Sequence, residues 1–464
     1  MSKNRSVITN FTEGPLTKRL FLFALPMMAG NVLQTLYTLV DMAIVGQFCG
    51  SSGLSAVSTS GQILMLLYGL GMCLGTGGQI LVAQQVGGGS RKNVSVTIGT
   101  SFTLTTIVSV VLAVACMVGR GWLLDLMNIP PEAKSEAYAY LFWCAIGVPF
   151  NSIYSSLSSV LRGLGDSKHP TWFMGVSCGA NIVLDYLLVA VFGMDAMGAA
   201  IATSGAQLLA CVACIGFICI HHEDLGIELK LNTLKMDRDT AVTIVKLATP
   251  LAVQNISINI SMMCINSWIN IYGVIASAVG GVGTKLYSLA GIVSGAMNTG
   301  TATFTGQNIA AGKTERVRQT MHSALLFAML YWLFCLCLCL FFPKAVFSLF
   351  TSDTAVLEMA PDYMHIMILM YLGSALMAPC NGLLNGIGDV RLSVVIGLTD
   401  GVIARISLCL IFARVLGFGL YGYWWGAALA SYVSVIWGWC YYFKGSWKTR
   451  KLLVTKEEPS LEEN

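Results

Sequence analysis

The stretch LRGLGDSK at residues 161–168 returns as LNGIGDVR at residues 384–391, 223 positions further along the chain. QQVGGGSRKNV at 84–94 matches QNIAAGKTERV at 307–317 with the same spacing. Other matches have spacings of 224 and 228: Pro26 and Asn31 with Pro250 and Asn255, and GAAIA (198–202) with GAALA (426–430). A nearly constant spacing over the whole length indicates two structurally related halves.

The composition places both halves in a membrane. Of the 464 residues, 55% are hydrophobic and 11% are charged, against a charged share of about 25% in soluble proteins. Because about 20 apolar residues cross a bilayer, charge-free runs such as Met42–Ser90 hold one or more spans. We expect an all-α integral membrane protein with twelve transmembrane helices in two six-helix lobes: 17–46, 54–86, 92–118, 132–157, 168–192, 195–219, 240–272, 277–309, 315–342, 356–379, 391–415 and 420–444.

The charges between these helices predict the orientation and the domain limits. Most of the 27 Lys and Arg residues fall in connections on one side, which the positive-inside rule makes cytoplasmic, so both termini are expected there. We expect an N-terminal lobe at 1–220, a cytoplasmic linker at 221–239, a C-terminal lobe at 240–446 and a cytoplasmic tail at 447–464. Two lobes of equal orientation suit alternating access around a site near the membrane midplane.

Several function classes lose support at this stage. The chain has no H-E-x-x-H, G-x-S-x-G or Walker-type phosphate loop, so an enzyme or an ATPase is not expected. The fifteen cysteines sit mostly in apolar runs without neighbouring His or carboxylate, which disfavours a metal site. A net charge of +4 does not indicate nucleic-acid binding. A channel is disfavoured as well, because it would be built from symmetric rings around a pore, whereas an acidic pair confined to one lobe fits ion-coupled transport better.

Two intramembrane carboxylates attract attention. Asp41 lies in TLYTLVDMAIVG (35–46) within a long apolar stretch, where an Asp costs about 2.5–3.5 kcal/mol on insertion scales. Asn181 and Asp185 in NIVLDYLL are four residues apart and share one helix face. These groups could form a functional site. Alternatively, Asp41 reaches water at a helix end, and Asn181 and Asp185 only hydrogen-bond neighbouring helices together.

The motifs resemble those of the multidrug and toxic compound extrusion (MATE) family. The resemblance rests on the glycine-rich segments after helices two and eight, the paired L-x-G-x-G-D loops, the GAA(I/L)A starts and Asp41. It implies a twelve-helix, two-lobed antiporter that exports organic cations and other amphiphiles against Na⁺ or H⁺. The acidic residues lie in the N-terminal lobe, which is similar to the DinF-like branch and implies a coupling-ion site: Asp41, Tyr140, Asn181, Asp185 and Thr203.

Two ions could occupy such a site. Na⁺ would take oxygens from Asp41, Asp185 and the neighbouring Asn and Thr, because hard cations prefer oxygen ligands. Alternatively the carboxyl pair holds a proton, since burial and a nearby like charge favour the neutral acid. The sequence leaves H⁺ and Na⁺ both open. No cofactor is expected.

The substrate side is less defined. Small amphiphilic cations would suit aromatic and polar groups, and the candidate cavity residues are Tyr37, Tyr154, Asn255 and Lys285. Lys285 either faces substrate or snorkels. Asp400 and Arg405, five residues apart, form a candidate intramembrane ion pair.

A flippase for a lipid-linked precursor, from a related group with a similar plan, is the alternative. It would need a strongly basic cavity, for which only Lys285 and Arg405 are candidates. We expect a monomer in the bilayer of a bacterial inner (plasma) membrane, without nucleic-acid partners.

Overall fold

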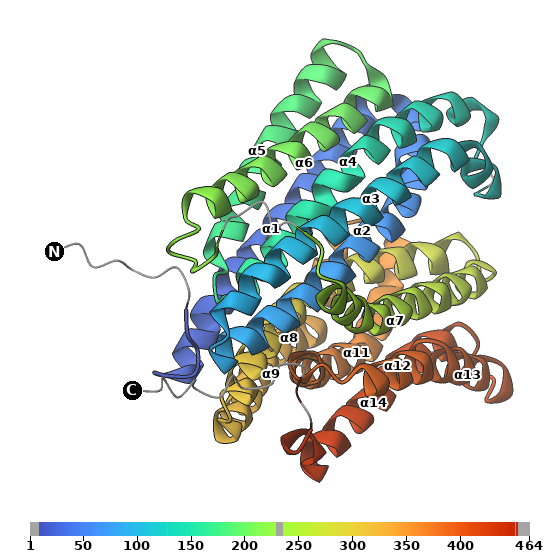
Figure 1. Ribbon diagram of the computed structural model, residues 1–464. Coiled ribbons are helices and arrows are strands. Elements are labelled where there is room, and N and C mark those ends of the chain that lie inside the picture. The colour runs from blue at the N-terminus through green and yellow to red at the C-terminus, as the bar shows by residue number, and fades with distance from the viewer. Residues whose placement is uncertain (1–8, 128, 229–234, 451, 453–464) are drawn as a thin grey trace, which may run out of the picture. The chain divides into compact units, whose positions relative to one another are not determined.

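The structure is a computed structural model that describes residues 9–127, 129–228, 235–450 and 452. Within these residues the chain is helical and contains no strand (Figure 1). The first half forms six long helical segments: α1 (Leu16–Phe48), α2 (Gly50–Gly88), α3 (Arg91–Leu126), α4 (Pro131–Gly163), α5 (Lys168–Asp185) continued by the π-helix η1 (Tyr186–Val191), and α6 (Asp195–Ile220).

The second half repeats this order with one broken helix. It contains, in chain order, α7 (Arg238–Asn270), α8 (Val274–Ala310), α9 (Thr314–Phe341), the short α10 (Pro343–Ser348), α11 (Thr354–Ile387), α12 (Val390–Leu398), the π-helix η2 (Thr399–Ala404), α13 (Arg405–Leu410), the π-helix η3 (Ile411–Val415), α14 (Gly419–Lys444) and the 3₁₀ turn η4 (Ser446–Lys448). The segments α12, η2, α13 and η3 follow one another without a gap and act as a single long helix.

The twelve long segments have the lengths that membrane helices need. Among the described residues, nine are both long and apolar enough to cross a bilayer, and α4, α8 and α14 are of similar length. The expected all-α, two-lobed membrane fold is confirmed. Three expected ends are too early: α3 continues to Leu126, α4 to Gly163 and α11 to Ile387. Pro379 lies inside α11, as membrane helices tolerate when neighbours satisfy the freed carbonyl.

The chain forms two compact units. One, the N-lobe, contains Leu25–Ala248, and the other, the C-lobe, contains Phe11–Ala24 and Thr249–Thr455. Part of the expected linker (229–234) and most of the expected tail (451 and 453–464) lie outside the described residues. Both unit borders fall just before a proline, Pro26 in α1 and Pro250 in α7.

The first part of α1 is held inside the C-lobe. The Phe11 ring stacks on Phe304 with centroids 3.9 Å apart, and the Phe11 amide donates to Gln307 Oε1 at 2.8 Å. At the second residue of α1, the hydroxyls of Thr17 and Ser323 share a hydrogen bond of 2.8 Å. This segment therefore packs as a part of the C-lobe although it opens the chain.

The first part of α7 is held inside the N-lobe in the same way. The Asp237 amide donates to Thr100 Oγ1 at 3.1 Å. The Asp237 carboxylate accepts from the Thr240 amide at 2.9 Å, and hydrogen bonds from Thr240 hold the pKa of Asp237 below its usual value. Further along α7, the Ile244 carbonyl packs closely on Gly77 of α2, since a Cβ added to Gly77 would lie only 2.7 Å from the carbonyl oxygen.

Each lobe is built around one central helix. In the N-lobe α4 packs on α2, α3 and α6, and in the C-lobe α11 packs on α8, α9 and α14. A Cβ added to Gly163 would meet the Gln79 carbonyl at 2.7 Å, and one added to Gly386 would meet the Ala302 carbonyl at 2.6 Å. These two contacts are related by the repeat spacing of 223, so the halves share their packing as well as their motifs.

Candidate functional site

The two carboxylates of the N-lobe meet in its interior. Asp41 is on α1 and is 8% exposed, and Asp185 ends α5 and is fully buried. Their carboxyl groups are within hydrogen-bonding reach of each other, provided that one of them carries a proton. Of the alternatives considered for Asp41, contact with water at a helix end does not agree with this burial.

Asp185 stands where the helix changes type. It is the last residue of α5, and the π-helix η1 begins at Tyr186. A π turn places an extra residue in a helix and rotates the residues after it, and such turns are frequent at functional sites. The sequence pattern placed one continuous helix at 168–192 and did not reveal this change.

Several polar atoms around Asp185 have no hydrogen-bond partner among the described residues. They are both carboxylate oxygens of Asp185, both amide atoms of Asn181, and Oδ1 of Asp41, when the two acids are ionised. Buried polar atoms are normally paired, and each unpaired one costs about 1–3 kcal/mol. Four of the five are oxygens, which a small cation or a shared proton would satisfy, and the fifth, Asn181 Nδ2, is a hydrogen-bond donor.

Two tyrosines border the carboxyl pair. Tyr37, one turn before Asp41 on α1, interacts electrostatically with both acids. Tyr140 on α4 is 6% exposed and interacts with Asp41 and with Cys144, to which it is hydrogen-bonded. The predicted site residues Asp41, Asn181, Asp185 and Tyr140 are thus all buried in the N-lobe.

A cavity of about 70 Å³ is lined in part by Asn181 and has room for several waters. Tyr37, Tyr154, Asn181 and Thr203 line it, all of them expected as site residues. The sequence analysis did not identify the other polar lining residues: Gln34, Asn151, Ser177 and Gln207. Gln207 could have been found, because it follows Thr203 by four residues on the same face of α6; it donates to the Tyr68 hydroxyl at 3.0 Å.

The donor set fits a light cation better than a transition metal. No group of three His, Cys, Asp or Glu side chains able to hold a metal ion occurs in the described part of the chain. The unpaired acceptors are carboxylate and amide oxygens, the ligands that hard cations prefer. The same oxygens would serve equally to hold a proton.

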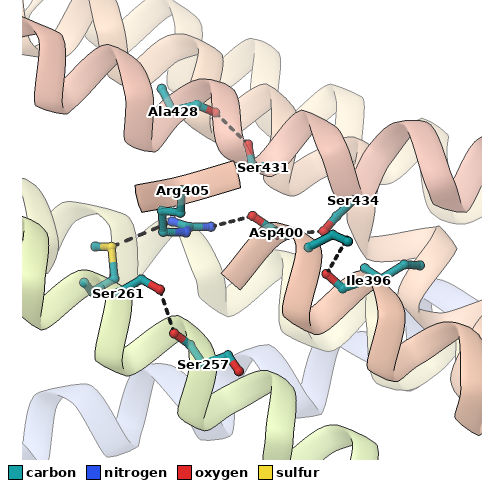
Figure 2. A network of polar contacts seen from close by, with 10 residues as sticks. Ser257, Ser261, Ile396, Asp400, Arg405, Ala428, Ser431 and Ser434 are labelled. Atoms are coloured by element: carbon teal, nitrogen blue, oxygen red, sulfur yellow. Dashed lines mark hydrogen bonds and ion pairs between the residues drawn. The ribbon is translucent and has the colours of Figure 1, made fainter. Parts of the chain in front are cut away.

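The C-lobe carries a different polar group in its interior. Arg405 Nη2 donates to Asp400 Oδ1 at 3.1 Å, and Ser434 Oγ donates to Asp400 Oδ2 at 2.7 Å. Figure 2 shows the ion pair between α7 and α14, with the Arg405 side chain directed at Asp400. The other two candidates of this lobe, Asn255 on α7 and Lys285 on α8, have exposed side chains and do not line the N-lobe cavity.

Comparison with known proteins gives the same assignment as the motifs. The profile of the MatE family matches twice, over residues 26–187 and 250–411. The chain belongs to the MatE family. The two matches are 224 residues apart and cover the two halves of the repeat.

The relatives of this MatE protein are named for multidrug resistance. It is 27% identical to the probable multidrug resistance protein YpnP of Bacillus subtilis, over 96% of this chain and 99% of that one. It is 24% identical to the probable multidrug resistance protein NorM of Thermotoga maritima, over 96% of each.

A solved structure shares the fold. An outward-facing multidrug resistance MATE family transporter of the MOP superfamily matches with a TM-score of 0.89 at 21% identity, covering 97% of this chain and all of that one. The inferred resemblance to this family is confirmed, and the expected role in multidrug export agrees with the names of these relatives.

Proposed function

We propose that this MatE protein exports small amphiphilic, cationic compounds in exchange for H⁺ or Na⁺, with the ion bound in the N-lobe at Asp41, Asn181 and Asp185. The observation that carries this proposal is the buried group of five unpaired polar atoms on these three residues. A membrane interior makes such a group costly unless it is used. Thr203 and Tyr140 complete the site from α6 and α4.

A carboxyl pair of this kind supports coupling through its charge. When both acids are ionised they repel each other and lack partners, and a bound Na⁺ or a proton removes both costs. The N-lobe thus has two states of different charge, which an ion gradient can drive in one direction. The alternative in which Asp185 and Asn181 only join helices does not account for their unpaired atoms.

The cavity supports a cationic substrate more than a pyrophosphate-linked lipid. None of its lining residues is basic, and Tyr37 and Tyr154 offer aromatic faces, which attract organic cations. A flippase is therefore not favoured. The Tyr154 hydroxyl already donates to the Pro170 carbonyl at 2.8 Å, so this residue would present its ring.

The test is gradient-driven accumulation of a fluorescent cation inside inverted vesicles, with an imposed Na⁺ gradient or an imposed pH gradient. Asp41→Asn and Asp185→Asn should each abolish transport by the effective gradient, at unchanged protein level. The matched control is Asp195→Asn, an exposed acid of the same lobe, which should transport normally. Coupled transport that survives both buried substitutions would refute the site; the gradient that works identifies the ion.

We further propose that the protein is a monomer of the DinF-like branch, acts without cofactor or bond chemistry, and lies in a bacterial plasma membrane with both termini in the cytoplasm. The distribution of Lys and Arg supports this orientation. Counted by position in the chain rather than by packing, the proposed limits remain 1–220 for the N-terminal six helices, 221–239 for the linker, 240–446 for the C-terminal six helices and 447–464 for the tail. A reporter that is active only in the cytoplasm, fused behind residue 464, should be active; an inactive fusion with an active counterpart behind Arg120 would reverse the orientation.

A further inference from the structure

The helices that carry the two polar groups differ by one residue. α5 and η1 together span 24 residues, and their C-lobe counterpart, Arg391–Val415, spans 25. The repeat spacing is 223 at Lys168 and Arg391, but 224 at Gly193 and Gly417. These two glycines both adopt left-handed backbone angles, with φ of 62° and 73°, which supports their equivalence.

The extra residue is taken up by a π turn. An insertion of one residue in a helix is accommodated in this way without disturbing the register on either side. η1 and η3 occupy equivalent places directly before the two glycines, whereas η2 has no counterpart in α5. The insertion therefore lies in η2, so the spacing is 223 up to its start and 224 beyond its end.

This register pairs five of the residues that line the N-lobe cavity with residues of the C-lobe. Asn181 corresponds to Arg405, just after η2, and Ser177 corresponds to Asp400 at its start. The spacings of 224 for α1 and 228 for α6 supply the remaining pairs: Tyr37 with Ser261, Thr203 with Ser431, and Ala206 with Ser434. All five C-lobe residues are drawn in the polar network of Figure 2.

The equivalents of the two N-lobe acids carry no charge. Asp41 corresponds to Ile265 and Asp185 to Cys409, both buried. The C-lobe thus lacks the carboxylates of a cation site at the equivalent positions. It has instead one carboxylate, Asp400, at a position that lines the cavity in the N-lobe.

The side chains around Asp400 surround a cation that belongs to the protein itself, the Arg405 guanidinium. Asp400 is 6% exposed and accepts from both Arg405 and Ser434. Arg405 is 5% exposed, and its Nη1 contacts Met262 Sδ at 3.7 Å. The groups facing the pair from neighbouring elements are the serines of α7 and α14, Tyr287 of α8 and Cys409 of α13; none of them is a second fixed charge.

We propose that the Arg405 guanidinium is a tethered cation that occupies, in the C-lobe, the counterpart of the N-lobe cavity, and that it limits the transporter to a single coupling site. A guanidinium remains charged at every physiological pH and cannot leave. The C-lobe therefore stays in one charge state through the cycle, while the N-lobe changes its own. This inference rests on the proposed function only for the role of the N-lobe as the coupled one.

The test removes the Arg405 charge in a protein whose N-lobe acids have been neutralised, so that the N-lobe no longer binds a cation. In an Asp41→Asn/Asp185→Asn background, the unfolding temperature in lipid nanodiscs is measured against Na⁺, with choline as replacement, and against pH. With Arg405 present, neither cation should shift it. Arg405→Asn, which installs the N-lobe residue, and the longer Arg405→Gln should make it rise by several degrees with Na⁺ or with falling pH, because Asp400 then needs a free cation.

Two controls separate charge from packing. Arg405→Lys keeps a tethered cation and should remain unresponsive, and so should Asp400→Asn/Arg405→Asn, which has no charge to neutralise. Folded Arg405→Asn and Arg405→Gln proteins without a cation response would overturn the proposal. The proposal would also be overturned if these two variants did not fold in Na⁺ or in acidic buffer and folded only when Asp400→Asn was added. A failure of the proposed function is a separate result: the unfolding temperatures of the native protein and of the Asp41→Asn/Asp185→Asn protein would then depend on Na⁺ and pH in the same way.

Discussion

The cavity of the N-lobe and the ion pair of the C-lobe occupy equivalent positions of one repeat but differ in charge. The residues that line the cavity are all neutral, and two acids lie beside it with unpaired oxygens. At the equivalent positions of the C-lobe, Arg405 and Asp400 neutralise each other. The helix packing is the same in both halves, since the Gly163 and Gly386 contacts agree within 0.1 Å, whereas the side chains at these equivalent positions differ.

The largest expected effect comes from giving the N-lobe the charge of the C-lobe. In Asn181→Arg the guanidinium would neutralise Asp185, and a bound Na⁺ or proton would no longer be needed. The rate of gradient-driven transport of the fluorescent cation should fall to that of vesicles without the protein, while the variant still folds. Asn181→Gln is the control and should retain measurable transport. Full transport by Asn181→Arg would show that the lobes do not differ in the proposed way.

Breaking the C-lobe pair should cost stability rather than coupling. Asp400→Ala leaves Arg405 buried without its counter-ion, which typically costs about 3–5 kcal/mol. The midpoint of unfolding of the purified protein in detergent measures it. Asp400→Leu/Arg405→Met replaces both charges by apolar groups and should recover most of the loss. An Asp400→Ala protein as stable as the native one would mean that Arg405 finds other partners.

The shared packing of the two lobes predicts equal penalties at equivalent glycines. Gly163→Ala and Gly386→Ala would each press a methyl group against a helix carbonyl, at 2.7 and 2.6 Å, for a cost of about 1–3 kcal/mol. Gly179→Ala in α5, where a Cβ meets nothing within 4 Å, should be neutral or slightly stabilising. Thermal unfolding of the three variants compares them. A penalty confined to one lobe would break the structural equivalence.

The most local change removes one hydroxyl. Ser434→Ala removes a hydrogen bond to Asp400 and gives the C-lobe the residue that the N-lobe has at this place, Ala206, for a loss of about 1.5–3 kcal/mol. The reverse change, Ala206→Ser, adds a hydroxyl to a cavity with room for water and should be nearly neutral. Denaturation midpoints measured side by side should show this asymmetry; equal effects would mean that Asp400 does not depend on Ser434.

Much of the fold can be predicted from the sequence because membrane helices have a strong signature. Charge-free runs and the repeat place all twelve segments, and the helix starts fall within a few residues of their observed positions. Ends were harder: α3 runs on past Arg120, whose guanidinium lies 4.9 Å from the Tyr138 ring centre, because a helix does not end where the apolar stretch does.

The candidate site could be predicted in part, for a similar reason. Asp41 and Asp185 stand out because charge is rare in apolar runs. Neutral lining residues such as Asn151 and Gln207 do not stand out, since Asn and Gln occur on many helices. The π turn at η2 is visible in the sequence only as a change of spacing from 223 to 224, and it acquires meaning only when the structure shows which side chains it brings together.

The exchange of helix starts has a consequence for dissecting the protein. Phe11–Ala24 belongs to the C-lobe and precedes the N-lobe in the chain, while Arg238–Ala248 belongs to the N-lobe and comes after the linker. A cut anywhere in the linker therefore produces two fragments that each carry a helical segment of the other's interior. Neither half is an autonomous folding unit, and a gene split there should yield active protein only when both pieces are made in the same cell.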